Sequence, residues 1–178
     1  TPEPSTTSTA SSASGASTYD TLPAPALTAL DTYVAAPDSS YSWTLASTID
    51  GPDYTGYILN LTSQTWRTTA EVNRTTWQHW LQVIVPDTLT SSTAVLKVSS
   101  GSKSGNPPTS LVGQGIQYAT SLNSVAVVLP TVPNQSLIFT DDGTSRVEDE
   151  IISYTFDKYL DGGDANWPLL LPMVKSAV

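Results

Sequence analysis

The sequence has no cysteine, one histidine and few basic residues. Without cysteine the chain can form no disulfide, no thiolate zinc site and no thiol nucleophile. Its single histidine, His79, excludes a metal site built from three histidines. The 7 Lys and Arg against 16 Asp and Glu give a net charge of −9, which argues against a nucleic-acid-binding surface, because such surfaces need clustered cations. We therefore predict no metal, no cofactor and no nucleic-acid partner.

Long apolar runs are missing as well. No segment approaches the roughly 18 apolar residues that cross a bilayer, so the sequence predicts no membrane span. No basic and apolar leader stands at its start, and we expect that any signal peptide has been removed. Three Asn-x-Ser/Thr sequons, at Asn60, Asn73 and Asn134, favour a secreted protein with N-glycans.

Composition divides the chain into two parts. Residues 1–21 are mostly Ser, Thr, Pro and Ala and carry almost no large apolar side chain. Burial of so little apolar surface does not offset the entropy lost on ordering, so we expect a disordered stalk, either plain or O-glycosylated. Residues 22–178 are long enough to form one domain with a core.

The first half of this domain has the pattern of a short helix followed by antiparallel strands. Leu27, Leu30 and Val34 recur at helical spacing. Apolar residues then alternate along two runs that a Gly-Pro turn connects, and a third run is apolar on both parities, as in a strand inside a sheet. The expected strands are residues 41–49, 57–61 and 77–85.

The second half predicts a strand, a helix and a strand at residues 93–98, 109–120 and 124–129. The last is a continuous apolar run typical of a parallel strand, and we expect the sheet to end there with an uncovered edge. Ser145 and Glu148 have capping-box spacing, which predicts a helix beginning there and ending at Gly162-Gly163. A final helix begins near Pro168 and Pro172. The fold class is therefore α/β, with antiparallel strands first and parallel strands later.

Three segments carry a resemblance to a known family: Leu61–Asp87, with its W-R and W-x-H-W patterns, Val132–Phe139, with V-P-N-Q, and Ser153–Val178. From about Leu30 to Val178 the chain resembles the PhoPQ-activated pathogenicity-related proteins, which are α/β-hydrolase-like and in many cases secreted. The resemblance implies the N-terminal portion of a hydrolase-like sheet flanked by helices, and a serine hydrolase of peptidase or esterase type when complete. A nucleophile elbow such as G-x-S-x-G does not occur in this sequence.

Two loops are candidates for lining a site. Ser100, Gly101 and Ser102 follow the strand after which α/β hydrolases place their oxyanion hole, and small residues let backbone N–H groups approach an oxyanion closely. Asn134 and Gln135 follow the next strand, where ligands of open α/β sheets collect. A plain surface turn is the alternative for the first loop. For Asn134, a buried or pocket-lining role competes with glycosylation.

The remaining candidates have ordinary structural explanations. His79 shares a strand face with Trp77 and Leu81, which predicts a hydrogen-bonded structural histidine over a catalytic one. The Asp residues at 141, 142, 161 and 164 lack EF-hand spacing and suit turns and caps. The five tryptophans could stack on carbohydrate, but core packing is the default for them.

The sequence therefore assigns no catalytic residue to this chain, and we predict that the chain alone is inactive. The alternative function is that of a non-catalytic secreted glycoprotein with a structural, assembly or signalling role on the same scaffold. In either case the uncovered strand and the apolar last helix predict a C-terminal companion chain or self-assembly.

Overall fold

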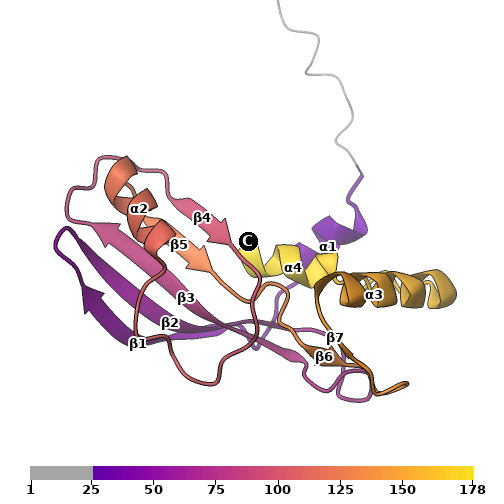
Figure 1. Cartoon of the computed structure of the whole chain (residues 1–178). Helices are drawn as coiled ribbons and strands as arrows, with labels where there is room; N and C mark the ends of the chain where they lie inside the picture. Colours follow the sequence, from indigo (N-terminus) through magenta and orange to yellow (C-terminus); the bar gives the residue numbers. More distant parts are fainter. Residues whose placement is uncertain (1–25) are drawn as a thin grey trace, which may run out of the picture.

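The structure is a computed structural model that describes residues 26–178 (Figure 1). The expected stalk at residues 1–21 lies outside the described residues. A five-stranded sheet with the order β1-β2-β3-β5-β4 forms the centre, and a two-stranded sheet, β6-β7, lies beyond one end of it. Within residues 26–178, no helix has both the length and the apolar character needed to cross a membrane.

The first three strands form the expected antiparallel sheet. They are β1 (Ser42–Asp50), β2 (Tyr54–Thr65) and β3 (Thr76–Pro86). Each pairs with the next along the chain, and the predicted turn connects β1 to β2. The register of β2 shifts between Thr62 and Gln64, which leaves Ser63 as the extra residue of a β-bulge.

The next two strands form the expected parallel pair. β4 (Val95–Val98) and β5 (Ala126–Leu129) run parallel, and α2 (Gly113–Leu122) connects them. β5 also pairs with β3 in the antiparallel sense, so it is an inner strand. The prediction that the sheet ends at residues 124–129 is therefore wrong: the crossover through α2 inserts β5 between β3 and β4, which leaves β4 at the edge.

Helices cover the two faces of the sheet unequally. The first face, called the α2 face, carries Ile58, Ile84 and Val128, and α2 packs on it so closely that a Cβ on Gly115 would fall 2.7 Å from Val128. The opposite face, called the α4 face, carries Leu61 and Leu129, and α4 (Leu170–Ala177) packs on it at one end. The short helix α1 (Ala29–Ala35) contacts α4.

The long helix α3 (Glu148–Gly162) begins in a different way from the expectation. Ser145 is in β7 (Ser145–Arg146), which pairs with β6 (Leu137–Ile138), so it cannot cap the helix. Instead, the Glu150 carboxylate accepts a hydrogen bond from the Val147 N–H at 3.3 Å. The predicted end of the helix is confirmed, because Gly163 takes a left-handed backbone (φ 72°) at the C-cap.

The aromatic residues build a core beyond the end of the main sheet. Trp66 and Trp77 are buried in it with Phe139, and their indole rings meet edge to face at 6.0 Å. Core packing is thus confirmed for these two tryptophans. This core fixes β6, β7 and α3 next to the carboxyl ends of β4 and β5, where both candidate loops are located.

Candidate functional site

The loops after β4 and β5 lie side by side. Residues 99–105 follow β4 and residues 130–136 follow β5, and we call them the strand-end loops. The Val132 N–H donates to the Ser99 carbonyl at 3.1 Å, and the Lys103 N–H donates to the Gln135 carbonyl at 3.2 Å. Ser102 and Gln135 form a parallel β-bridge. The structure therefore brings together the two segments that the sequence proposed separately.

The Arg74 side chain and the backbone of β3 fix the second strand-end loop. The Arg74 guanidinium donates to the carbonyls of Asn134 and Ser136, at 2.7 and 2.9 Å. The Asn134 side-chain amide donates to the Gln78 carbonyl at 2.7 Å. A loop held at so many points presents its backbone in one conformation, as a preorganised site requires.

Each of the two loops contains one residue with a positive φ. Gly101 has a φ of 146°, a conformation that essentially only glycine adopts. Thr131 has a φ of 63°, which is unusual for a β-branched residue. Ser100 and Ser102, on either side of Gly101, are exposed to solvent. Glycine adopts such a φ without strain, whereas Thr131 is strained, and strained backbone occurs preferentially at functional sites. Both positions lie two or three residues after a parallel strand.

Asn134 and Gln135 are buried in the second loop. Asn134 is fully buried, and its Oδ1 has no hydrogen-bond partner among the described residues. The Gln135 side chain forms two hydrogen bonds with Glu148. Its Nε2 donates to the Glu148 carboxylate at 3.2 Å, and its Oε1 accepts from the Glu148 backbone N–H at 2.8 Å. Gln135 therefore joins the loop to the start of α3.

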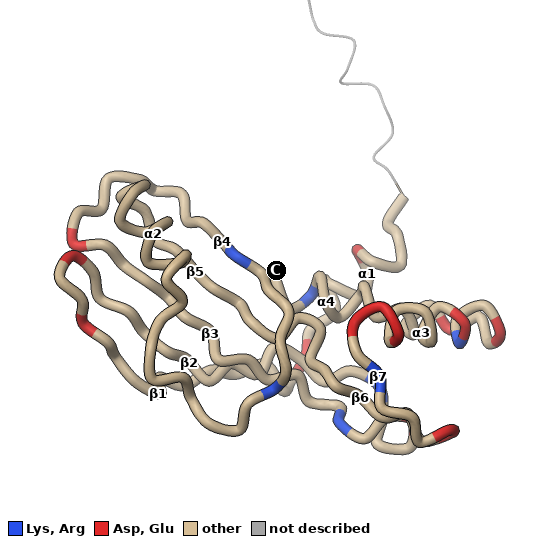
Figure 2. The backbone as a smooth tube through the Cα atoms, viewed as in Figure 1, with Lys and Arg blue, Asp and Glu red and all other residues tan. Residues whose placement is uncertain are grey.

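The electrostatic character of the loops differs from that of the whole chain. Arg74 lies beside the loops and Lys103 is part of the first one, and neither forms a salt bridge with the described residues. The acidic residues gather at the hairpin turns and along α3 (Figure 2). Burial lowers the pKa of Arg74. Burial, and then the charge of Arg74, lower the pKa of Lys103. Two cations close together without a carboxylate partner favour a bound anion or a developing negative charge.

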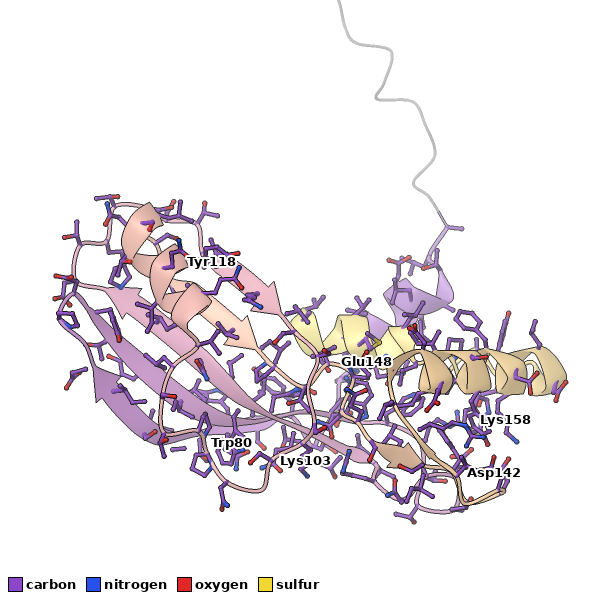
Figure 3. All side chains as sticks on the ribbon, viewed as in Figure 1. Trp80, Lys103, Tyr118, Asp142, Glu148 and Lys158 are labelled. Carbon is purple, nitrogen blue, oxygen red and sulfur yellow. The ribbon has the colours of Figure 1, made fainter. Side chains whose placement is uncertain are left out.

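The aromatic neighbour of this site is Trp80. Its indole N–H donates to the Ser104 carbonyl at 3.1 Å, and Figure 3 shows Trp80 and Lys103 on the same side of the molecule, at the loop after β4. The indole thus fixes the first strand-end loop to β3. Trp80 is only partly buried, whereas Trp77, on the opposite face of the same strand, is fully buried in the core.

A second arrangement of polar residues lies under α4, beside a cavity of about 370 Å³ that opens on the α4 face. The Ser63 hydroxyl is 3.0 Å from His79 Nε2, and His79 Nδ1 is 2.9 Å from the Pro130 carbonyl. Because a carbonyl only accepts, the proton resides on Nδ1, and Nε2 accepts from Ser63. Burial lowers the pKa of His79, with a further contribution from the charge of Lys103.

The Ser63–His79 contact has the geometry of a nucleophile and its base. The structure, however, uses the serine hydroxyl in a longer chain of hydrogen bonds. Ser176 of α4 lies 3.1 Å from Ser63, and the Gln64 amide donates to Ser176 at 2.9 Å. Only 6% of Ser63 is exposed. The chain of hydrogen bonds fixes α4 to the sheet, and the expected structural, hydrogen-bonded role of His79 agrees with its burial.

Sequence reasoning missed several residues of these arrangements, among them Ser63, Arg74 and Glu148. The serine reaches His79 from the neighbouring strand at a bulge, and no local pattern reveals that pairing. Arg74 and Glu148 are distant in sequence from the loop that they contact. The W-x-H-W pattern marks β3, the strand that contains His79, but it does not show which residues contact that strand.

The three sequons lie in different surroundings. Asn134 uses its amide nitrogen internally and is buried, so the folded chain has no space for a glycan there. Asn60 lies within β2 and accepts a hydrogen bond from Gln78. Asn73 is exposed, and its Oδ1 accepts from the Ile138 N–H at 3.0 Å. Its side-chain amide nitrogen forms no hydrogen bond with the described residues.

Three of the four aspartates that might suggest calcium form ion pairs. Asp142 pairs with Arg146, and Asp141 pairs with Lys158 at 2.6 Å. Asp164 pairs with Arg67 at 2.8 Å. Within residues 26–178, no three His, Asp or Glu side chains come together in a way that could hold a metal ion.

Comparison with known proteins agrees with the resemblance noted in the sequence. The chain is 40% identical over 153 residues to autocrine proliferation repressor protein A of Dictyostelium discoideum, a match that covers 85% of this chain and 31% of that relative. No solved structure matches the chain. Residues 30–178 match the PhoPQ-activated pathogenicity-related protein family, and the chain therefore belongs to this family.

Proposed function

We propose that the chain is the N-terminal portion of a secreted α/β-hydrolase-like enzyme, a serine hydrolase of peptidase or esterase type. The strand-end loops would form one wall of its active site, with backbone N–H groups at Gly101 and Ser102 serving as oxyanion donors. The nucleophile, its acid and its histidine come from polypeptide outside these 178 residues, because no nucleophile elbow occurs here. The catalytic role of the chain is therefore positioning and electrostatic stabilisation.

One observation carries this proposal: the two loops at the carboxyl ends of the parallel pair are joined to each other, and each has a positive φ, at Gly101 and at Thr131. Ligands of open α/β sheets bind at that end of the strands. The cations Arg74 and Lys103 beside the loops suit a substrate or transition state with negative charge.

Fluorophosphonate labelling of the protein purified from its natural source tests the proposal. We expect a serine outside residues 1–178 to be labelled. An alanine at position 101 does not readily adopt a φ of 146°, so the Gly101→Ala loop should turn its N–H groups away from the oxyanion and lose about 10²–10³ in ester-hydrolysis kcat, the usual cost of one misplaced donor. Gly105→Ala is the matched control, because a Cβ at Gly105 meets nothing within 4 Å and its φ is not positive. Equal activity of the two variants, or no labelled serine, would contradict the proposal.

A non-catalytic signalling role is the second candidate, and it is favoured by the name of the relative, a proliferation repressor. In that case the hydrolase scaffold would present surfaces to a receptor and carry no reaction. Addition of the purified protein to growing cells of its source, before and after fluorophosphonate treatment, separates the two functions. Repression of growth that survives complete modification supports signalling, and repression lost on modification supports the enzyme.

A further inference from the structure

Basic side chains are scarce in this chain, and most of them have a partner. Four of the seven bond to carboxylates or to backbone carbonyls: Arg67, Arg146, Lys158 and Lys175. Arg74 and Lys103 differ, since neither forms a salt bridge with the described residues. In a chain of net charge −9, two cations at one place without a carboxylate create a local field that attracts anions.

Arg74 is held in place by part of its guanidinium and keeps another part free. Its Nη2 donates to two carbonyls of the second strand-end loop, those of Asn134 and Ser136, at 2.7 and 2.9 Å. Its Nε is buried without a partner among the described residues, whereas Nη1 has no partner there and is not buried. Nη1 is therefore an open donor on a fixed side chain, which binds an anion at little further cost in side-chain entropy.

Lys103 reaches the same place from the first strand-end loop. Its backbone N–H donates to the Gln135 carbonyl at 3.2 Å, and the carbonyl of the next residue, Ser104, accepts from the Trp80 indole at 3.1 Å. The backbone is thus fixed on both sides of a side chain whose ammonium has no bonding partner among the described residues. Next to burial, the charge of Arg74 lowers the pKa of Lys103, so the two cations are close enough to act on one ligand.

We propose that Arg74 and Lys103 form an anion-binding subsite that holds a permanently charged group of the substrate, a carboxylate or a phosphate. This inference rests on the proposed function, because the subsite lies beside the oxyanion donors at Gly101 and Ser102. The substrates are then esters or peptides with a negative group close to the bond that is cleaved. Glu148 contacts the second loop but does not fill the subsite, since its carboxylate forms no salt bridge with either cation.

The charge of the two side chains indicates a permanent anion in addition to the transition-state charge. Backbone N–H groups stabilise the oxyanion, which develops only as the reaction proceeds. The full charges of Arg74 and Lys103 attract an anionic substrate before the reaction as well as during it. Such uniform binding lowers KM and leaves kcat almost unchanged. Changes at Lys103 and at Gly101 should therefore alter different kinetic constants.

Amine footprinting tests the subsite without any catalysis. The whole protein, purified from its natural source, is treated with acetic anhydride in sodium succinate, in sodium phosphate and in sodium chloride of equal ionic strength. We expect succinate or phosphate to slow acetylation of Lys103, and the more effective anion identifies the preferred group. Lys97 of β4 is the internal control, because it also forms no salt bridge with the described residues. Equal rates at Lys103 in the three salts, or equal slowing at both lysines, would overturn the inference.

Substrate preference gives a second result. The p-nitrophenyl esters of succinic acid (as the hemiester) and of butyric acid are a matched anionic and neutral pair. In the full-length protein, Lys103→Met should raise KM for the hemisuccinate about tenfold, the size expected for one charge-assisted hydrogen bond, and change kcat little. Lys97→Met should leave the ratio of kcat/KM for the two esters unchanged. An equal effect of Lys103→Met on both esters would overturn the inference, because a merely structural lysine would not distinguish them.

The subsite and the enzyme fail separately in these experiments. Protection of Lys103 by an anion, without any fluorophosphonate-reactive serine, supports the subsite and removes the enzyme. A reactive serine without protection of Lys103 and without a preference for the hemisuccinate keeps the enzyme and removes the subsite.

Discussion

Two buried polar residues, Ser63 and His79, connect the sheet to α4. Their hydrogen bonds extend through Ser176 and Gln64 to the Tyr33 hydroxyl of α1, which donates to Gln64 at 2.9 Å. The Gln64 amide also donates to the Pro172 carbonyl at 2.7 Å, so every donor in this network has an acceptor and the network orders the helices. The same arrangement keeps the imidazole neutral.

Stability at low pH should therefore depend on His79. Its pKa is lowered from 6.5 in the folded chain, mainly by burial, so the unfolded chain binds the proton first. The contribution of the neutral imidazole is fully present above the unfolded pKa and is lost as pH falls below about 6.5 towards the folded pKa. Melting temperatures from pH 7.5 to 5 should fall for the native chain and fall less for His79→Gln. Parallel pH profiles for the two proteins would contradict this role.

Ser63 should be unreactive despite its histidine. Its hydroxyl is buried and donates to His79 Nε2, so a fluorophosphonate should not label it in the folded chain. Ser63→Ala removes the donor to the imidazole and should cost about 1–3 kcal/mol of unfolding free energy, as for other buried groups left unsatisfied. Denaturant titration measures that cost. Mass spectrometry that finds the probe on Ser63, and finds it lost after denaturation, would show instead that this chain contains its own nucleophile.

At the scale of elements, α2 packs closely on the sheet. Gly115 lies over Ile84 and Val128, and a Cβ there would fall 2.8 and 2.7 Å from their side chains. Gly113 starts the same helix, and a Cβ there meets nothing within 4 Å. The two glycines therefore have different surroundings. Gly115 allows the helix to pack closely on the sheet, whereas Gly113 is at the open N-terminal end of the helix.

Alanine at each position should have opposite effects. Gly115→Ala overpacks the interface and should destabilise the protein by about 1–3 kcal/mol. Gly113→Ala reduces the conformational entropy of the unfolded chain and should stabilise it by up to about 1 kcal/mol. Thermal unfolding of both variants, compared in the assembled protein if the isolated chain does not melt cooperatively, measures the difference. A neutral Gly115→Ala would mean that α2 can move away from the sheet at little cost.

At the scale of the whole molecule, the exposed groups decide which modifications and partners are possible. Glycan occupancy tests the secreted location directly. Asn73 is the exposed sequon, whereas Asn134 is buried, and Asn60 lies inside a strand. Peptide mass spectrometry after glycosidase treatment in heavy-oxygen water should mark Asn73 and leave Asn134 unmarked. An unmarked Asn73 in protein from the natural source would count against secretion.

Local patterns determined most of the element types before the fold was known. Alternation predicted β1 and β2, apolar runs predicted β3, β4 and β5, and helical spacing predicted α1 and α3, because each signal needs only neighbours within a few residues. Glycine conformation fixed the end of α3 at Gly163 in the same local way. The W-x-H-W and V-P-N-Q segments gave the family, which residues 30–178 match.

Tertiary structure decided what depends on contacts between distant segments. It placed β5 inside the sheet and β4 at its edge, since the position of a crossover depends on which strand already occupies the neighbouring place. It prevented Ser145 from capping α3 by pairing that residue with β6. It also paired Ser63 with His79 and buried Asn134, because a bulge on one strand and an arginine from another loop set these contacts. Hydrogen bonds between residues 16 to 62 positions apart leave no periodic trace in the sequence, so only the folded chain shows them.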